Sequence, residues 1–394
     1  MAKFLKSVLM LAVVVFACGC SEGGDSDAPA AKRTVLVYIA ANNDLSGYAQ
    51  MNMNDMVYGA ADCNLESDNL IVYVSTPNEN PCLYRIDKNG KKLIKSYPAQ
   101  NSLQPDVMAN VLAEVRERYP APSNGVIFWS HGFGWLPKNI FATRADVADS
   151  DSPHPMTKNF GVDNLSTSGI SAETIASILP DNAYDFIAFD ACYMGAVEVV
   201  WPLRNKCKYF MASAAEVLTE GLPYSKVIAD FFSDDKSYLQ TVAYKYYKTY
   251  SEKSRAYDRS ATIAVVDCQK LESMAAEMKR LANKYSDKTV DLNTMQWFDR
   301  TSYGNHFAYD MADFIDHLCA GEDASELDNF NNLLNKAIPA KYATETLWKG
   351  DYKNRDIVVK KFCGLSMFVP MTNEPEATMN IYKTTDWYKY FYKN

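Results

Sequence analysis

Short, uninterrupted hydrophobic runs are the dominant pattern in the chain from residue 34 onward. Runs of strand length lie at 34–40, 70–75, 125–130, 186–189, 209–213 and 262–266. Because these runs are apolar throughout rather than at alternate positions, they predict strands buried on both faces of a mostly parallel sheet. Two further runs, 83–86 and 93–97, flank Lys88-Asn89-Gly90 and predict a β-hairpin.

Segments with helical spacing alternate with the hydrophobic runs. Helices are expected at 106–119, 171–179, 195–203, 224–232, 238–254 and 271–285. Pro120 closes the first of them, and Ser171 is placed to cap the second. The alternation predicts an α/β fold with helices on both faces of the sheet. Beyond residue 285 only 364–369 has the character of a strand, and the remainder is expected to form an α+β subdomain packed on the sheet.

The first twenty residues have the pattern of a targeting segment. Lys3 and Lys6 precede an apolar stretch at 8–17 that is too short to span a bilayer. The stretch ends in Ala17-Cys18-Gly19-Cys20, which resembles a bacterial lipobox with Cys20 as the lipidated residue, and an ordinary signal peptide is the alternative. We therefore expect an exported protein that is bound to the membrane of the bacterial cell envelope through an N-terminal lipid anchor or, if the segment is an ordinary signal peptide, secreted.

The division of the chain follows from this pattern. Residues 21–33 are small and polar, as expected of a flexible tether. A folded core is expected over 34–260, with 261–394 packed on it.

Charge and composition exclude some classes of function. Among 394 residues, 48 acidic and 40 basic side chains give a net charge of -8 and are mixed along the chain. No Lys/Arg stripe offers phosphate contacts, which argues against nucleic acid as a partner.

The cysteines and histidines lack the spacing of a metal site. Nine cysteines are present, and seven remain once Cys18 and Cys20 are set aside. The seven show no CxxC motif and no repeated spacing, so neither a zinc site nor a dense disulfide framework is expected. His154, His306 and His317 have no second ligand at metal spacing. No cofactor is expected, and calcium dependence leaves no signature in the sequence.

Two of the predicted strands deliver a reactive side chain where they end. Strand 125–130 is followed by His131-Gly132, and strand 186–189 leads to Cys192. The carboxyl ends of parallel strands meet at one edge of a sheet, so an imidazole and a thiol would lie together there. Such a pair is a nucleophile with its base, and the backbone N–H groups of Gly132 and Cys192 would form an oxyanion hole. A buried structural cysteine is the alternative interpretation of Cys192.

Three sequence blocks carry a family resemblance. They are Tyr38-Ile39-Ala40-Ala41-Asn42-Asn43-Asp44-Leu45, Ser-His-Gly-Phe-Gly-Trp at 130–135, and Asp190-Ala191-Cys192-Tyr193-Met194-Gly195. In this order and spacing they resemble the caspase-type cysteine peptidases and, within them, the clostripain (C11) family. The resemblance implies a caspase-like three-layer α/β/α sandwich and an endopeptidase that cleaves proteins and peptides after Arg or Lys. It also implies a His131–Cys192 dyad with no essential third member.

The same resemblance implies a pocket for the basic P1 residue of the substrate. Asp190 would be an acidic wall of this S1 pocket, Asn43 would neighbour it, and Glu220 stands where the family usually has Asp. A carboxylate in a narrow pocket pairs with a guanidinium or ammonium group and would repel an acidic P1 residue. The alternatives are that Asp190 caps the following helix, Asn43 turns the chain, and Glu220 is a surface acid.

Members of the family are often activated by self-cleavage in the loop after the histidine. Arg144, within the polar segment 138–168, is the expected cut, with Lys138 and Lys158 next; the alternative is a merely solvated arginine. Val217 and Leu222 depart from the family pattern. They keep open a rival function, a catalytically inactive caspase-like lipoprotein that binds peptides or protein partners.

Overall fold

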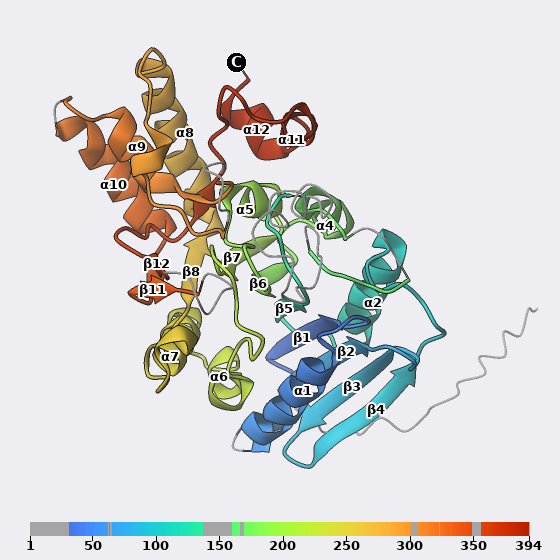
Figure 1. Ribbon diagram of the computed structural model, residues 1–394. Helices are drawn as coiled ribbons and strands as arrows, with labels where there is room; N and C mark the ends of the chain where they lie inside the picture. The colour runs from blue at the N-terminus through green and yellow to red at the C-terminus, as the bar shows by residue number, and fades with distance from the viewer. Residues whose placement is uncertain are drawn as a thin grey trace, which may run out of the picture.

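A nine-stranded sheet forms the centre of the molecule (Figure 1). The computed structural model describes residues 31–61, 63, 65–136, 160–165, 169–300, 306–322, 324–348 and 356–393. The strands of the sheet are β1 (Arg33–Ala40), β2 (Asp68–Ser75), β3 (Cys82–Asp87), β4 (Gly90–Ser96), β5 (Ser123–Trp129), β6 (Tyr184–Asp190), β7 (Cys207–Ala212), β8 (Thr262–Asp267) and β10 (Ala340–Ala343).

The strand order is β10-β8-β7-β6-β5-β1-β2-β3-β4, so β10 and β4 are the two edges. The five central strands β7, β6, β5, β1 and β2 run parallel. The outer strands β3, β4, β8 and β10 pair antiparallel. The prediction of a mostly parallel sheet is therefore confirmed.

Helices cover both faces of the sheet. One face is covered by α1 (Ser46–Ala61), α6 (Tyr224–Phe231) and α7 (Tyr238–Ser251). The other is covered by α2 (Pro105–Arg118), α4 (Ala172–Ile178), α5 (Val197–Leu203) and α8 (Cys268–Lys284). Two separate hydrophobic cores result, one on each side of the sheet, which is the three-layer sandwich expected from the sequence.

Local sequence explains where several of these elements begin and turn. Ser171 accepts a hydrogen bond from the Thr174 N–H at 3.1 Å and starts α4, as predicted. Asp267 caps α8 through the Gln269 N–H, so this helix begins three residues before the predicted Leu271. Gly90 has a φ of +110°, which its lack of a side chain permits at the β3–β4 turn.

The last third of the chain extends the sheet and adds a helical layer. Its elements are α9 (Met311–Leu318), α10 (Ser325–Ala337), α11 (Glu376–Tyr382), α12 (Asp386–Phe391), and the short strands β9 (Tyr309–Asp310), β11 (Thr346–Leu347), β12 (Ile357–Val358) and β13 (Ser366–Met367). β8 and β10 lie beyond the expected boundary at residue 260 yet belong to the central sheet. The expected strand at 364–369 is reduced to β13, which pairs with β9.

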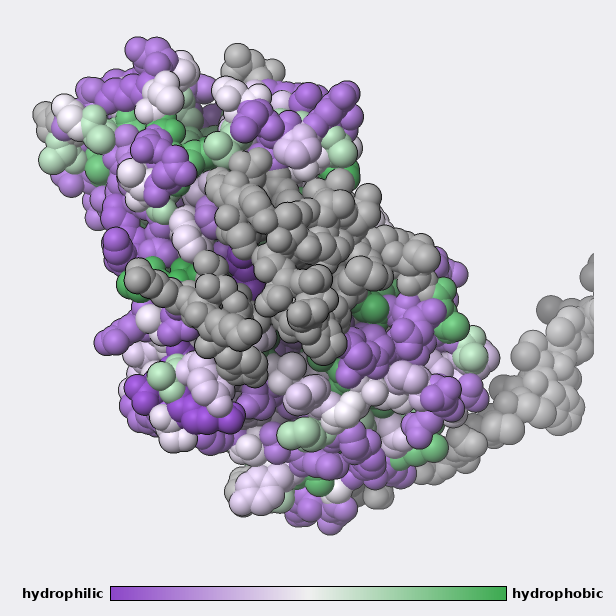
Figure 2. Space-filling view, in the orientation of Figure 1, coloured by the Kyte–Doolittle hydropathy of each residue, from purple (hydrophilic) through white to green (hydrophobic). Residues whose placement is uncertain are grey.

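The described surface is largely hydrophilic on the face seen in Figure 2, with scattered hydrophobic residues. Within the described ranges, no helix is both long enough and apolar enough to cross a membrane.

Glu198 ties the C-terminal layer to the helix that follows Cys192. Its Oε1 accepts hydrogen bonds from the Phe368 N–H at 2.9 Å and the Tyr382 hydroxyl at 3.3 Å. Burial raises the pKa of the Glu198 carboxyl to about 8. The folded protein therefore retains a proton that the unfolded chain releases above its ordinary pKa of 4.5.

This proton makes folding stability depend on pH. The stabilisation of the folded state by the protonated Glu198 carboxyl is fully present below pH 4.5, and it is lost as the pH rises to about 8. Glu198→Gln, which stays neutral, should flatten this dependence and raise stability at pH 8 by on the order of 3 kcal/mol relative to the wild type. Denaturant unfolding at pH 5 and pH 8 measures the difference, with the exposed Glu272→Gln as control. If the free energy of unfolding changes with pH in the same way in Glu198→Gln and in the wild type, the assignment of this pH dependence to Glu198 is wrong.

Candidate active site

Loops from three parallel strands converge at the carboxyl edge of the sheet. Trp129 of β5 pairs with Ile39 of β1 and with Asp190 of β6. The segments after these strands therefore leave the sheet at the same level, and the predicted base and nucleophile each lie two residues beyond a paired position. A Cβ added to Gly132 would lie 2.3 Å from the Cys192 carbonyl oxygen and 2.9 Å from its nitrogen. The two loops are thus in backbone contact.

His131 is buried and oriented by a carboxylate. Its side chain is 9% exposed, and its Nε2 lies 2.9 Å from Oδ1 of Asp44 in the loop after β1. This hydrogen bond lowers the pKa of Asp44. The sequence analysis did not assign a role to Asp44. Asp44 lies four residues after the end of the predicted strand 34–40, so the sequence could place its loop at the same sheet edge as His131 but not the direction of its side chain.

The Cys192 thiol lies against the backbone of Val217. Its Sγ accepts a hydrogen bond from the Val217 N–H at 3.3 Å and donates to the Val217 carbonyl at 3.5 Å. Burial raises the pKa of the thiol to about 12, and the Glu216 carboxylate adds to the rise. At neutral pH the group is a thiol rather than the thiolate that attacks carbonyl carbon. The arrangement is therefore a latent one.

Backbone hydrogen bonds hold the covering segment 213–217 beside the cysteine loop. The Tyr193 N–H donates to the Ala215 carbonyl at 2.9 Å, and the Gly195 N–H donates to the Ser213 carbonyl at 2.7 Å. Tyr193 adopts a φ of 59°, a conformation that side chains other than glycine rarely take. Such outliers collect at functional sites, where the surrounding structure enforces them.

A largely buried ion pair adjoins the thiol. Arg300 Nε donates to Oε1 of Glu216 at 2.5 Å, and the guanidinium lies 5.1 Å from the ring centroid of Trp348. Glu216 belongs to the segment that covers the thiol. The pair therefore links this segment to the C-terminal layer, a connection that the sequence did not signal.

Asp190 lies buried at the end of β6, beneath the segment 221–224. Its Oδ2 accepts hydrogen bonds from the Leu222 N–H and the Tyr224 hydroxyl, both at 3.0 Å. Burial raises the pKa of this carboxyl to about 6. A Cβ on Gly221 would come within 2.6 Å of Oδ2, so glycine keeps side-chain atoms off the carboxylate. The interpretation of Asp190 as a helix cap is wrong, because Ala196 is the N-cap of α5.

Asn43 and Glu220 bond to partners other than Asp190. The Asn43 side chain donates to the Val162 carbonyl at 2.7 Å and accepts from the Leu45 N–H at 2.8 Å, which is the geometry of a turn residue. Glu220 forms a surface ion pair with Lys253 at 3.2 Å. The structure thus places both residues in loops near the carboxyl edge without joining them to one pocket.

Some of the residues predicted from the sequence lie outside the described residues. They are Cys20, Lys138, Arg144, His154 and Lys158. Within the described ranges, no group of three or more His, Cys, Asp or Glu side chains is arranged to hold a metal ion.

The Asp44–His131 contact gives a testable expectation. Asp44→Ala should lower kcat/KM by roughly 10- to 100-fold, because the imidazole loses the partner that fixes its orientation and tautomer. Asp44→Asn should recover part of the loss, since an amide oxygen can still accept a hydrogen bond from Nε2. Steady-state kinetics over pH 5–9 is the measurement, with Asp181→Ala, a surface acid paired with Lys206, as control. Full activity of Asp44→Ala at every pH would show that the dyad needs no third member.

Comparisons with known proteins identify a matching family and similar solved structures. The model of the clostripain family matches residues 37–393. An inactive zymogen C11 protease from Parabacteroides distasonis superposes with a TM-score of 0.75 at 28% identity, covering 91% of this chain and 98% of that one. A secreted C11 cysteine protease from Bacteroides thetaiotaomicron, in complex with an irreversible peptide inhibitor, gives the same TM-score, identity and coverage. Among curated proteins, no sequence matches significantly. The chain therefore belongs to the clostripain family and is a C11 cysteine protease.

Proposed function

We propose that the protein is an exported endopeptidase that cleaves after Arg or Lys, with Cys192 as nucleophile and His131 as base. The observation that carries the proposal is the backbone contact between Gly132 and Cys192 at the ends of the paired strands β5 and β6. This contact fixes the two loops relative to each other. The rigid sheet beneath them supplies the preorganisation that covalent catalysis requires.

The chemistry follows from these positions. His131 accepts the Sγ proton, and the thiolate attacks the scissile carbonyl carbon. The backbone N–H groups of Gly132 and Cys192 would stabilise the resulting oxyanion. The imidazolium then donates its proton to the leaving amine, and water hydrolyses the thioester with His131 again as base. Asp44 would hold the imidazole through these steps.

Asp190 is the proposed selector of a basic P1 residue. It is buried two residues before the nucleophile, and Gly221, which packs against its carboxylate, has no side chain there. A desolvated carboxylate binds a guanidinium or ammonium group strongly and disfavours neutral side chains. Asn43 would support the loop beside this pocket. Glu220 would add a second negative charge only after leaving Lys253.

We infer that the chain is made as a zymogen. The Val217 contacts and the raised pKa of the Cys192 thiol support this reading, since substrate and thiolate both require segment 213–217 to move. One structural relative is itself an inactive zymogen. Self-cleavage after Arg144, in the loop that follows His131, is the proposed trigger.

The N-terminal pattern supports export to the cell envelope. Cys20 would carry the lipid, and the tether to the membrane would end before Arg33, one residue earlier than expected, because Arg33 already belongs to β1. One structural relative is a secreted protease. Proteins and peptides with a basic P1 residue are the proposed substrates, and no nucleic acid is expected to bind.

Asp190→Asn tests the specificity. The variant should lose at least roughly 100-fold in kcat/KM toward P1-Arg and P1-Lys peptides, because the charge that pairs with the substrate is gone. In the wild type, the same parameter should rise with pH through about 6 as Asp190 ionises, and this rise should be absent from the variant. Glu220→Gln, which removes the charge of a nearby acid in the same way, is the control. An unchanged P1 profile in Asp190→Asn would remove this residue from the pocket.

A further inference from the structure

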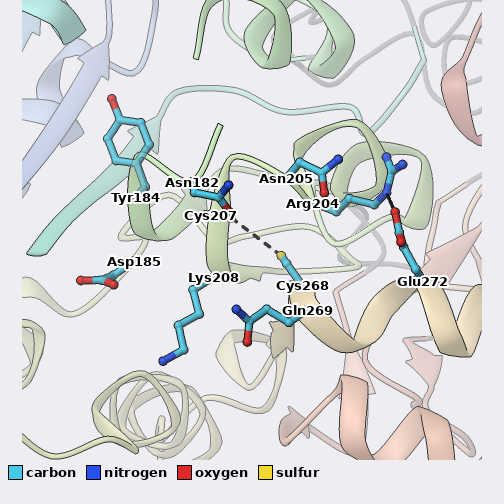
Figure 3. Close-up of a pocket in the computed structure, with 10 residues that line it drawn as sticks. All are labelled: Asn182, Tyr184, Asp185, Arg204, Asn205, Cys207, Lys208, Cys268, Gln269 and Glu272. Atoms are coloured by element: carbon cyan, nitrogen blue, oxygen red, sulfur yellow. Dashed lines mark hydrogen bonds and ion pairs between the residues drawn. The ribbon is translucent and has the colours of Figure 1, made fainter. Parts of the chain in front are cut away.

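A pocket opens at the end of the sheet opposite to Cys192 (Figure 3). Its volume is about 270 Å³, and its walls come from the starts of β6 and β7 and the first turn of α8. Polar side chains such as Asn182 and Gln269 surround it, and Arg204 forms an ion pair with Glu272 at 2.8 Å. Since strands rise by roughly 3.3 Å per residue, β6 separates this pocket from the active site by about 20 Å.

Two cysteines share the wall of this pocket. Cys207 is the first residue of β7, and Cys268 is the first residue of α8. Their sulfur atoms are 3.8 Å apart, and both residues are buried. A dashed line in Figure 3 marks the contact between the two side chains.

The backbone geometry suits a covalent link between them. β7 and β8 pair antiparallel with Tyr209 opposite Asp267. If β8 continued by one residue, Cys268 would stand opposite Lys208 and share its face of the sheet, not that of Cys207. Cys268 instead opens α8, and this turn of the chain brings its sulfur to that of Cys207. Closing the sulfur–sulfur distance from 3.8 Å to about 2.05 Å is therefore within reach of side-chain rotation.

The surroundings favour the oxidised form. Burial raises the pKa of the Cys207 thiol, so it persists as an S–H group whose hydrogen-bonding capacity is poorly used. Besides Cys268, the thiol contacts the Ile187 backbone, and its distance to the Leu203 carbonyl is long, at 3.9 Å. By contrast, the Cys363 thiol donates to the Leu365 carbonyl at 3.1 Å. A disulfide would remove two weakly bonded donors from the core, and the adjoining pocket gives a reagent a path to them.

We propose that Cys207 and Cys268 form a disulfide bond in the exported protein. The oxidant is a disulfide, either of a protein thiol oxidase or of a small molecule such as oxidised glutathione. One thiolate of the pair attacks a donor sulfur to give a mixed disulfide, and the second thiolate displaces the donor. The pair loses two electrons and two protons, and the donor disulfide gains them as two thiols.

The bond would join α8 covalently to β7. This strand pairs with β6, which leads into the loop that carries Cys192. The bond closes a loop between residues 61 positions apart, so it should stabilise the fold chiefly by restricting the unfolded chain. The proposal rests on the export inferred above and not on proteolytic activity.

Differential thiol labelling of the full chain, exported in bacterial cells, tests the proposal. The Cys192→Ala background is used, so that neither self-cleavage nor the reactive thiol interferes. Cells are quenched in acid, free thiols are alkylated under denaturing conditions, and disulfides are then reduced and labelled with a second reagent. Peptide mass mapping should find the second label on Cys207 and Cys268, and a 2 Da deficit in the linked peptides before reduction. Finding the first label on both would overturn the proposal.

Thermal unfolding gives an independent readout. Reductant should lower the Tm of the Cys192→Ala protein by roughly 3–8 °C. The same treatment should leave a Cys192→Ala/Cys268→Ala variant unchanged, and a Cys192→Ala/Cys363→Ala variant should respond like the parent. Should the Cys268 variant not fold, equilibration of the parent in glutathione buffers replaces it. A pair that stays reduced in oxidised glutathione, while the protein remains folded, refutes the proposal.

Discussion

Cys192→Ala is expected to abolish hydrolysis of a P1-Arg fluorogenic peptide, with a loss of at least about 10⁴-fold in kcat. In the proposed mechanism Cys192 supplies the electron pair that attacks the carbonyl, and without it only substrate-binding and oxyanion contacts would remain. The same variant should remain uncut, because cleavage after Arg144 is proposed to be the enzyme's own work. Intact-mass analysis of the purified chain, beside the peptide assay, measures both effects.

The control for this experiment is a second partly exposed thiol. Cys82→Ala removes a side chain in β3 that bonds only weakly to the Asn80 carbonyl, at 3.4 Å, and should leave activity unchanged. Activity retained by Cys192→Ala would contradict the assignment of the nucleophile. If the wild type is inactive, cleavage of the loop by an added Arg-specific protease should activate it. A wild type that stays inactive after that cut would contradict the proposed peptidase.

Gly132→Ala should also impair catalysis strongly, although it removes no reactive group. The added Cβ would meet the Cys192 carbonyl oxygen at 2.3 Å and the nitrogen at 2.9 Å. Both are backbone atoms, so the two loops must separate. A shift of about 1 Å in the base or the nucleophile typically costs about 100-fold in rate. We expect a loss of more than about 100-fold in kcat/KM, together with a lower Tm.

A matched glycine distinguishes this clash from a general effect of alanine. Gly47 lies in α1 with no atom within 4 Å of its added Cβ. Gly47→Ala should keep full activity and gain stability, by up to about 1 kcal/mol, because alanine favours the helix. Near-wild-type kinetics of Gly132→Ala would show that the loops carrying His131 and Cys192 can accommodate the added Cβ, and would contradict the expected clash.

The central strands could be predicted from the sequence because burial on both faces leaves a continuous hydrophobic signature. β1 is an example, since every residue from Thr34 to Ala40 is buried. Helix α1 could not be predicted in this way. Met53 and Met56 are the only large apolar side chains among its buried residues, and Ala49, Asn52, Gly59 and Ala60 are small or polar, so its apolar stripe is weak. Asn52 is buried because it accepts a hydrogen bond from Trp129 at 2.7 Å, a tertiary contact with no local signal.

The candidate site was predictable in part for a similar reason. His131 and Cys192 follow strands, so strand order alone brings them to one edge. Asp44 reaches His131 from the loop after β1, and its role depends on a side-chain direction that spacing does not encode. The covering of Cys192 by Val217 depends on the path of segment 213–217 across the sheet edge. Only the folded chain defines that path.

The outer edge of the sheet also bears on how many copies can share a membrane. Among the described residues no strand pairs with the outer side of β4, and such edges recruit strands from neighbouring molecules. Lys91 and Lys92 are exposed along it, so two such edges approaching each other would bring like charges together. The proposed lipid tether would confine the protease to two dimensions, where collisions are frequent. Mutual repulsion of these edges would let the molecules crowd there without joining into a continuous sheet.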